Sequence, residues 1–262
     1  EPFANLLTQG MVLNEIYFRK PASGRVVYYN PADVDVQVDE KGARIGARLR
    51  EDGLPVEAGG IGTMSKSKGN GVDPQALVQQ YGADTARLFM MFAAPPEQSL
   101  EWSDEGVEGA FRFMKRLWKA VHQHVAQGPA PALDVPSLSP AQRDLRRQVH
   151  ETLAKGAVDI GRRRTFNTAI AAVMEPMKSL ARSDDPSPQG RAVMQEALDI
   201  VVLALSPVVP HACHALWREL GHATAAVDER WPQVDTAALA RETVEVVVQV
   251  NGKLRGRLTV PV

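Results

Sequence analysis

The stretch Phe166-Asn167-Thr168-Ala169-Ile170-Ala171-Ala172-Val173-Met174-Glu175-Pro176-Met177-Lys178-Ser179-Leu180 decides the fold of this chain. Its large apolar side chains recur at helical spacing and therefore share one stripe: Phe166, Ile170, Val173, Met174, Met177 and Leu180. A second stripe follows at the same spacing: Met194, Leu198, Val201, Val202 and Leu205. Two such stripes in succession predict the core of an antiparallel helical bundle. Pro176 lies inside the first helix, where we expect a kink or a local break in hydrogen bonding.

Helix start signals extend this bundle towards the N-terminus. Ser103-Asp104-Glu105 combines a capping serine with acidic residues that suit the helix dipole, and the Pro- and Ala-rich stretch 127–138 ends that helix. Ser139-Pro140-Ala141-Gln142 supplies a first-turn proline and a capping box for a helix that extends to about Arg162. Asp73-Pro74 begins a shorter helix in the same way. Helices are therefore expected from residue 73 to about residue 222.

Extended segments flank the helices on both sides. Residues 17–62 hold alternating Val-rich runs separated by glycines, which predicts a small β-rich module. Near the C-terminus, two Val- and Leu-rich runs flank Asn251-Gly252, a pair that accepts the positive φ angles of a type I′ turn and so predicts a β-hairpin. A lone hairpin is barely stable, so we expect partner strands beyond Val262. The predicted fold is mainly α, an antiparallel bundle with a β-rich insertion before it and a C-terminal β-hairpin.

Composition excludes several classes of protein. The 262 residues are 44% hydrophobic and 23% charged, which argues against wholesale disorder, collagen-like repeats and a long coiled coil. The single cysteine, Cys213, can form neither an internal disulfide nor a multi-thiolate metal site, as is typical of a reducing compartment. No apolar run approaches the ~20 residues that span a bilayer. We therefore expect a soluble, cytoplasmic protein, and the absence of an initiator Met suggests part of a longer chain.

The net charge of −1 hides a basic middle segment. Residues 111–182 carry 13 Lys and Arg against 5 Asp and Glu, whereas residues 1–110 carry 10 against 16 and residues 183–262 carry 7 against 10. Such a segment favours a surface that faces a polyanion, and a solvated helix face is an equally good interpretation of the charge alone.

The segment that carries chemistry is Gly59-Gly60-Ile61-Gly62-Thr63-Met64-Ser65-Lys66-Ser67-Lys68-Gly69-Asn70-Gly71. It places two lysines and two serines between glycines and ahead of a capped helix, so backbone N–H groups, hydroxyls and ammonium groups can meet a chain of phosphates. It does not have the Gly-x4-Gly-Lys-Ser/Thr pattern of a Walker A loop. From the residues alone, a flexible surface loop is as good an interpretation.

Residues 64–70 resemble the Lys-Met-Ser-Lys-Ser signature of class I aminoacyl-tRNA synthetases. The surrounding sequence resembles bacterial-type leucyl-tRNA synthetases over nearly the whole chain, in the stretches 6–13, 73–89, 101–113, 163–172 and 247–253. The residues that carry this resemblance include Tyr81-Gly82-Ala83-Asp84, Arg163-Arg164-Thr165-Phe166-Asn167 and Val250-Asn251-Gly252-Lys253. Together these stretches are far more specific than the loop alone.

The resemblance implies a division of the chain into five parts. Residues 1–16 would end a catalytic core, 17–62 would form a leucine-specific β-rich insertion, 63–100 the signature loop and following helices, 101–226 the tRNA-binding (anticodon-binding) bundle, and 240–262 the start of a truncated C-terminal domain. The parent would be a monomer that activates leucine with ATP and Mg²⁺ and transfers it to tRNA(Leu), without contact to a membrane. We expect this portion alone to be inactive and to hold no cofactor.

The resemblance also assigns roles to single residues. ATP would contact Met64, Ser65, Lys66, Ser67 and Lys68, and Lys66 would be the catalytic residue, because its ammonium stabilises the charge that develops on the phosphates. Thr63 stands where the signature has its first lysine, and Lys68 is a partial substitute. His211-Ala212-Cys213-His214 lacks the glycine of the His-x-Gly-His element and follows the loop, so we interpret it as a helix start and expect no metal site.

Three basic clusters are candidates for tRNA contact. They are Arg112, Lys115, Arg116 and Lys119 on one helical face, opposite Phe111, Met114, Leu117 and Trp118; Arg162, Arg163 and Arg164 at a helix junction; and Lys253 and Arg255, with Arg257, on the last strand. For the first two clusters we identify no acidic intrahelical partner. The alternative interpretations are a solvated helix face, compensation of a helix dipole and an ordinary exposed strand.

Two alternative functions remain from the sequence. The chain could work alone as a non-catalytic tRNA-binding module, or it could be the same region of an isoleucyl, valyl or methionyl enzyme. The β-rich module and Asn251-Gly252-Lys253 favour the leucyl enzyme.

Overall fold

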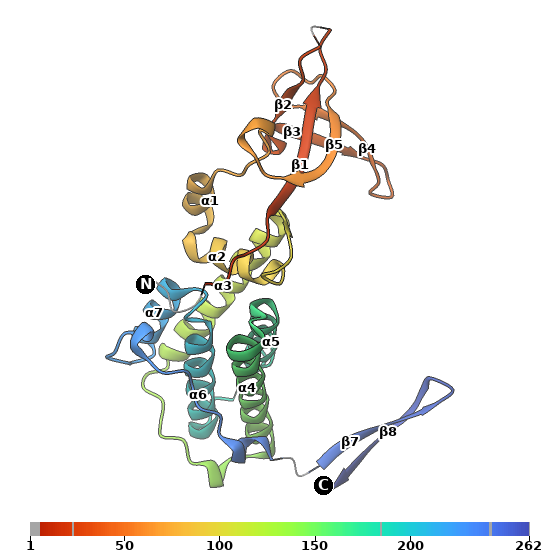
Figure 1. Ribbon diagram of the computed structural model, residues 1–262. Coiled ribbons are helices and arrows are strands. Elements are labelled where there is room, and N and C mark those ends of the chain that lie inside the picture. Colours follow the sequence, from red (N-terminus) through yellow and green to blue (C-terminus); the bar gives the residue numbers. More distant parts are fainter. Residues whose placement is uncertain (1–5, 23, 184, 241–242, 262) are drawn as a thin grey trace.

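The computed structural model describes residues 6–22, 24–183, 185–240 and 243–261. A helical bundle forms most of the described chain, a small β module lies at one end of it, and a β-hairpin projects away from the bundle near the C-terminus (Figure 1). The predicted fold class is confirmed. None of the described helices is both long enough and apolar enough to cross a membrane.

Local capping sets the helix boundaries. The helices are α1 (Pro74–Tyr81), α2 (Ala83–Ala93), α3 (Asp104–Val125), α4 (Pro140–Val158), α5 (Phe166–Leu180), α6 (Pro188–Leu205) and α7 (Pro210–Glu219). The side chains of Asp73 and Ser103 accept from the backbone N–H groups of Gln75 and Gly106, and Ser139 and Gln142 form the predicted reciprocal capping box. The start signals in the sequence are therefore confirmed, because capping depends only on neighbouring residues.

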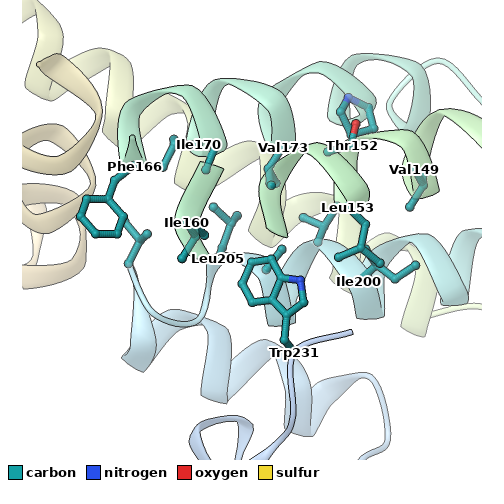
Figure 2. Close-up of a pocket in the computed structure, with 16 residues that line it drawn as sticks. Val149, Thr152, Leu153, Ile160, Phe166, Ile170, Val173, Ile200, Leu205 and Trp231 are labelled. Carbon is teal, nitrogen blue, oxygen red and sulfur yellow. The ribbon is translucent and has the colours of Figure 1, made fainter. Parts of the chain in front are cut away.

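The core lies where the two apolar stripes meet. Leu198 and Leu205 of α6 pack with Ile170 and Met177 of α5 in one large hydrophobic cluster. Helix α5 continues through Pro176 to Leu180, so the missing N–H interrupts the hydrogen-bond ladder without ending the helix. Figure 2 shows the gap left between α4, α5 and α6, which Trp231 covers and which no charged side chain lines.

The buried face of α3 differs from the one that the sequence predicted. The residues buried along it are Val107, Ala110, Phe113, Leu117, Val121 and His124. Phe111 and Met114 lie at the edge of this face, and Trp118 is 43% exposed. The predicted apolar face was therefore rotated, because a sequence does not reveal on which side of α3 the other helices pack.

The β module is built around β1 (Val12–Arg19). Strands β2 (Val27–Tyr29) and β5 (Glu57–Thr63) flank it antiparallel, and the two-residue strand β6 (Leu100–Glu101) pairs parallel with its first residues. Strands β3 (Val34–Val38) and β4 (Arg44–Leu49) form a separate ribbon. Strand β1 continues through the boundary predicted between residues 16 and 17, so that division falls inside a strand.

A second, small hydrophobic core holds the module together. Its buried residues are Tyr17, Val34, Ala47, Leu49 and Val56. Burial and the hydrogen bond to Glu15 raise the pKa of Tyr17 to about 12. The ribbon thus packs on the β1 sheet through side chains and through one backbone hydrogen bond, from Val56 to the carbonyl of Ala47 at 3.0 Å.

Helix α2 supports the start of α7 through a buried carboxylate. Asp84 accepts hydrogen bonds from the backbone N–H of Ala212 at 2.7 Å and from Nδ1 of His211 at 2.9 Å. Arg87 donates to the carbonyl of Val208 at 2.9 Å. The segment from His211 to His214 is a helix start, as predicted, and its capping group comes from another helix because Val209 has no side-chain cap.

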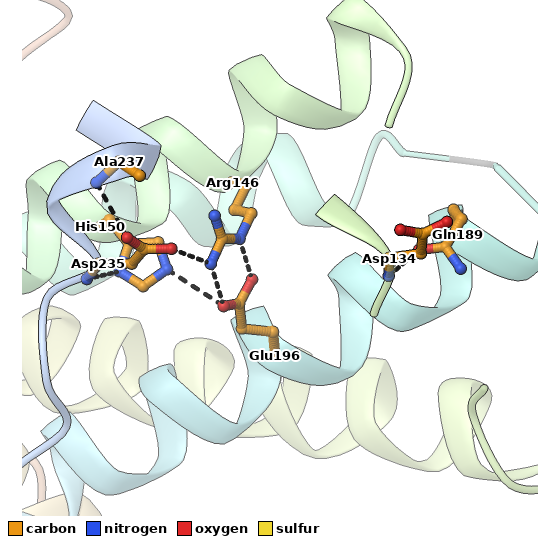
Figure 3. Close-up of polar contacts among 7 residues, drawn as sticks. All are labelled: Asp134, Arg146, His150, Gln189, Glu196, Asp235 and Ala237. Atoms are coloured by element: carbon orange, nitrogen blue, oxygen red, sulfur yellow. Dashed lines mark hydrogen bonds and ion pairs between the residues drawn. The ribbon is translucent and has the colours of Figure 1, made fainter. Parts of the chain in front are cut away.

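A buried ion network fixes the linker between the bundle and the hairpin (Figure 3). The guanidinium of Arg146 (α4) makes two hydrogen bonds to Glu196 (α6), at 2.7 and 2.9 Å, and one to Asp235 at 2.7 Å. Nδ1 of His150 accepts from the backbone N–H of Asp235 at 3.2 Å, and its Nε2 lies 3.3 Å from Glu196. Two helices and the linker therefore share one set of charges.

The network also sets the protonation of its carboxylates. Burial raises the pKa of Glu196, but the hydrogen bonds from His150 and Arg146 outweigh it and hold this pKa below its usual value. The hydrogen bond from Arg146 likewise lowers the pKa of Asp235. Both carboxylates are therefore ionised at pH values above their usual pKa, and the ion pairs with Arg146 stabilise the fold in that range.

The hairpin consists of β7 (Thr243–Val250) and β8 (Lys253–Pro261), paired antiparallel. Asn251 and Gly252 at its turn have φ angles of 51° and 73°. These positive values confirm the predicted turn chemistry.

Replacing Arg146 by methionine should lower the free energy of unfolding by about 1–3 kcal/mol at pH 7, because the carboxylates of Glu196 and Asp235 both lose their guanidinium partner. Since the pKa values of both carboxylates are depressed, this stabilisation is present above their unfolded values and is lost as the pH falls through their folded ones. Urea titrations of both proteins at several pH values measure the difference. The control Arg147→Met removes two ion pairs within α4, to Asp144 and Glu151, and should cost under about 1 kcal/mol. Equal losses for the two variants would contradict the role of the network.

Candidate functional site

The signature segment is an ordered turn at the end of β5. This strand includes residues 59–62, which were predicted as part of the β-rich module, and also Thr63, which was predicted to begin the loop. Ser65 then caps one turn of 3-10 helix, Lys66–Lys68, with its Oγ 3.3 Å from the backbone N–H of Lys68. Gly69 ends the turn with φ of 62°, a conformation that favours glycine. The glycines around the lysines therefore shape a defined turn.

One buried asparagine holds this turn against the β sheet. Asn70 is 0% exposed, and its Oδ1 accepts from the backbone N–H of Ser65 at 2.9 Å. Its Nδ2 is directed at the carbonyls of Asn14, Gly62 and Thr63, each at 3.4 Å. In return, the side-chain amide of Asn14 donates to the carbonyl of Asn70 at 3.1 Å.

Two further contacts complete the attachment. The backbone N–H of Met64 donates to the carbonyl of Val12 at 3.0 Å, and the side chain of Asn30 donates to the carbonyl of Gly71 at 3.1 Å. Sequence reasoning missed all three asparagines as site residues. Asn70 was visible beside the lysines, but its partner Asn14 lies 56 positions away and only the fold brings the two together.

The cations of the turn are available to an anion. Lys66 and Ser67 are exposed, and Lys68 is partly buried. Across the part of the chain that the structure describes, no carboxylate lies within 4.0 Å of either ammonium group. A Cβ built on Gly62 would lie 3.7 Å from Nζ of Lys68, so this ammonium lies beside Gly62 near the end of β5. The turn can therefore offer two ammonium groups and two hydroxyls to phosphate oxygens.

The cluster on α3 forms an exposed basic face, as predicted. Its four members are exposed: Arg112, Lys115, Arg116 and Lys119. The prediction that this face lacks an acidic partner is wrong for one of them, because Glu108, one turn earlier, lies 3.5 Å from the guanidinium of Arg112. Within the described chain, the other three have no ion pair. Such exposed pairs are weak, so the face keeps its positive charge.

The arginine triplet closes a short π-helix, with Arg162 and Arg163 inside it and Arg164 directly after it. Residues Asp159–Arg163 form this turn, and Arg164 has φ of 56°, an uncommon value for a side chain other than glycine. Asp159 is 1% exposed, and its Oδ1 lies 3.4 Å from the exposed guanidinium of Arg163, so the predicted lack of an acidic partner is wrong here too. All three arginines point their charge to solvent. The junction therefore presents cations above a buried carboxylate.

The third cluster lies apart from the other two. Lys253 and Arg255 are exposed on β8, in the hairpin that projects from the bundle (Figure 1). The turn, α3, the junction and the hairpin thus occupy four separate elements. No group of three or more His, Cys, Asp or Glu side chains that could hold a metal ion is found in the described ranges.

Two families match parts of the chain. Residues 142–262 match the anticodon-binding domain of tRNA ligases, and residues 51–103 match the class I tRNA synthetases for I, L, M and V. Leucine–tRNA ligase of Nitrosospira multiformis is 66% identical over 265 residues, a match that covers 99% of this chain and 30% of that relative. The leucine–tRNA ligases of Chromohalobacter salexigens and Pseudomonas aeruginosa PAO1 are 62% and 56% identical, over 100% and 99% of this chain and 30% of each relative.

A solved structure shows the same relationship. It is the ternary complex of Agrobacterium radiobacter K84 agnB2 LeuRS with tRNA and LeuAMS, and it superposes with a TM-score of 0.66 at 28% identity. The match covers 76% of this chain and 26% of that one. The chain thus spans about 30% of the length of the curated relatives that it matches.

Replacing Asn70 by alanine should lower the free energy of unfolding by about 1–3 kcal/mol, because the partly buried N–H of Ser65 and three carbonyls lose the contact with its side chain. Hydrogen exchange of the Ser65 amide should accelerate at the same time. The control Ser67→Ala removes an exposed hydroxyl and should change stability by less than about 0.5 kcal/mol. Unchanged exchange at Ser65 in the Asn70 variant would show that the asparagine does not hold the turn.

Proposed function

The chain belongs to the leucine–tRNA ligase family, of which it matches the C-terminal portion, and from that membership we propose that the whole protein activates leucine with ATP and transfers it to tRNA(Leu). One observation in the structure supports the role of this portion: a turn held by Asn70 carries two ammonium groups that have no carboxylate partner among the described residues. The alternative of an isoleucine, valine or methionine enzyme is disfavoured, because the close relatives are leucine ligases.

The turn is suited to the first half of the proposed reaction. The leucine carboxylate attacks the α-phosphorus of ATP, the bond to the β-phosphate oxygen breaks, and pyrophosphate leaves with added negative charge. The exposed ammonium of Lys66 stabilises that charge more in the transition state than in the bound substrate, because the backbone turn that carries it is formed before the reaction begins. Met64, Ser65, Ser67 and Lys68 would contact the ATP.

The chemistry of the turn fits a triphosphate. It offers hydrogen-bond donors and positive charge and no carboxylate, so repulsion between like charges does not oppose the ligand. Mg²⁺ would arrive with the ATP phosphates and neutralise part of their charge. We also propose that Lys68 supplies part of the charge that Thr63 lacks, because its ammonium lies beside the end of β5.

The bundle would supply the surface for tRNA. Residues 101–226 carry the α3 face and the arginine junction, and residues 240–262 add the cations of the hairpin. The β module of residues 17–62 would be the leucine-specific insertion. The complex of the Agrobacterium LeuRS with tRNA supports a tRNA partner. The single cysteine is buried, which raises the pKa of its thiol, and a lone free thiol fits the reducing cytoplasm.

In the full-length protein, Lys66→Ala should slow formation of leucyl-adenylate by about 10²–10³-fold while leucine affinity changes little. Single-turnover measurements of pyrophosphate release give the rate, and equilibrium dialysis gives the leucine affinity. The control Lys41→Ala removes an exposed lysine of the β module and should leave both unchanged. An unaltered activation rate in the Lys66 variant would refute its catalytic role.

The double variant Arg112→Ala, Arg116→Ala should flatten the salt dependence of tRNA binding by up to about two counterions. Phosphate contacts release counterions, so the slope of log affinity against log salt counts them. The control Lys155→Ala, Arg182→Ala removes the same charge from α4 and from the residues after α5. A folded double variant with the original slope would show that the α3 face does not bind tRNA.

A further inference from the structure

Aromatic and cationic side chains alternate along a ridge of α3. Phe111, Lys115, Trp118 and His122 follow each other at i, i+4, i+7 and i+11, so they lie on one side of the helix. Nζ of Lys115 lies 4.5 Å from the ring centroid of Phe111, and the rings of Trp118 and His122 are 5.0 Å apart at 44°. Phe111 in turn contacts Tyr81 edge to face at 5.5 Å. These side-chain contacts restrict the rotamers of the residues that form the ridge.

Trp118 is more exposed than the other three tryptophans of the chain, of which Trp231 is partly buried over the gap between α4, α5 and α6. Trp217 is buried and stacks on His222, and Trp102 is partly buried, contacts Phe89 and donates to Asp104. Trp118 leaves 43% of its surface to solvent, and in the described chain its indole N–H has no protein acceptor. The fold therefore keeps a large, flat apolar surface in water beside His122.

The surroundings of Trp118 indicate what such a surface binds. Lys115 lies one turn before it, Lys119 follows it, and Arg116 belongs to the adjoining basic face. An apolar protein partner would have to bury these cations without counter-charges, which is costly. A nucleotide covers the ring with its base and leaves its phosphate at the rim, where the cations pair with it.

We propose that Trp118, backed by His122, is a stacking platform for an unpaired nucleobase of the bound RNA. The proposal rests on the proposed function and adds to it: the RNA element at this face carries an unstacked base, as in a loop or bulge. A double-stranded stem does not fit, because its bases are already stacked on each other and expose only edges to a side chain. The neighbouring cations hold the flanking phosphates.

The test uses the full-length protein with three probes: a tRNA(Leu) transcript, a single-stranded oligouridylate and an RNA duplex with the same number of phosphates. Trp118→Ala should weaken binding of tRNA and oligouridylate by about 5- to 100-fold and should leave duplex binding unchanged. Trp118→Phe keeps an aromatic face and should restore most of the affinity, whereas Trp118→Leu keeps bulk alone and should not. The salt slope should stay as in the parent.

Controls separate this inference from the proposed function. Phe92→Ala removes another exposed aromatic, on α2, and should leave all three affinities unchanged. A thermal melt of each variant checks its fold, and rescue by phenylalanine excludes a loss caused by misfolding. If the Arg112→Ala, Arg116→Ala variant flattens the salt slope while Trp118→Ala binds tRNA normally, the α3 face contacts phosphates and the stacking proposal for Trp118 is wrong. Equal losses for duplex and single strand, or full affinity with leucine at this position, also overturn it.

Discussion

The hydrogen bonds of the first three residues of β1 are the constraint on which the other parts depend. The carbonyl of Val12 accepts from Met64 at 3.0 Å, and the carbonyl of Leu13 accepts from Trp102 at 2.8 Å, just before α3 begins. The side chain of Asn14 binds the carbonyl of Asn70. The lysine turn and the segment that leads into α3 are therefore hydrogen-bonded to neighbouring residues of one strand. Strand β1 is hydrogen-bonded to strands on both sides and is therefore a stiff support, so each element has a fixed place relative to the other.

Charges in this protein divide into two groups by burial. Arg146 is 6% exposed and is matched by two carboxylates, which lower the cost of removing it from water. The side chain of Arg163 is 68% exposed and forms one long ion pair, to Asp159 at 3.4 Å. Lys66 and Lys68 of the turn have no ion pair within the described ranges. Paired buried charges hold helices and linker together. The exposed lysines and arginines keep a positive surface potential, which attracts a polyanion.

Several features could be predicted because they depend on neighbours in the chain. The capping residues Asp73, Ser103 and Ser139 set helix starts through bonds to amides two or three positions away, and Asn251-Gly252 sets its turn through its own backbone preference. The motif with Lys66 could likewise be identified from contiguous residues. The role of Lys66 in catalysis stays a prediction. The tRNA contacts of the three basic clusters stay predictions as well.

What the sequence by itself determined is thus local: helix starts, the periodic stripes that form a bundle, the hairpin turn and the identity of the lysine motif. Only the tertiary structure decided which side of α3 is buried, and so left Trp118 in solvent. It also decided that Asp84 caps α7 from 128 positions away and that Asn70 reaches Asn14 across 56. The physical reason is that these contacts have no periodic or neighbouring signal, since they arise where separate elements happen to pack.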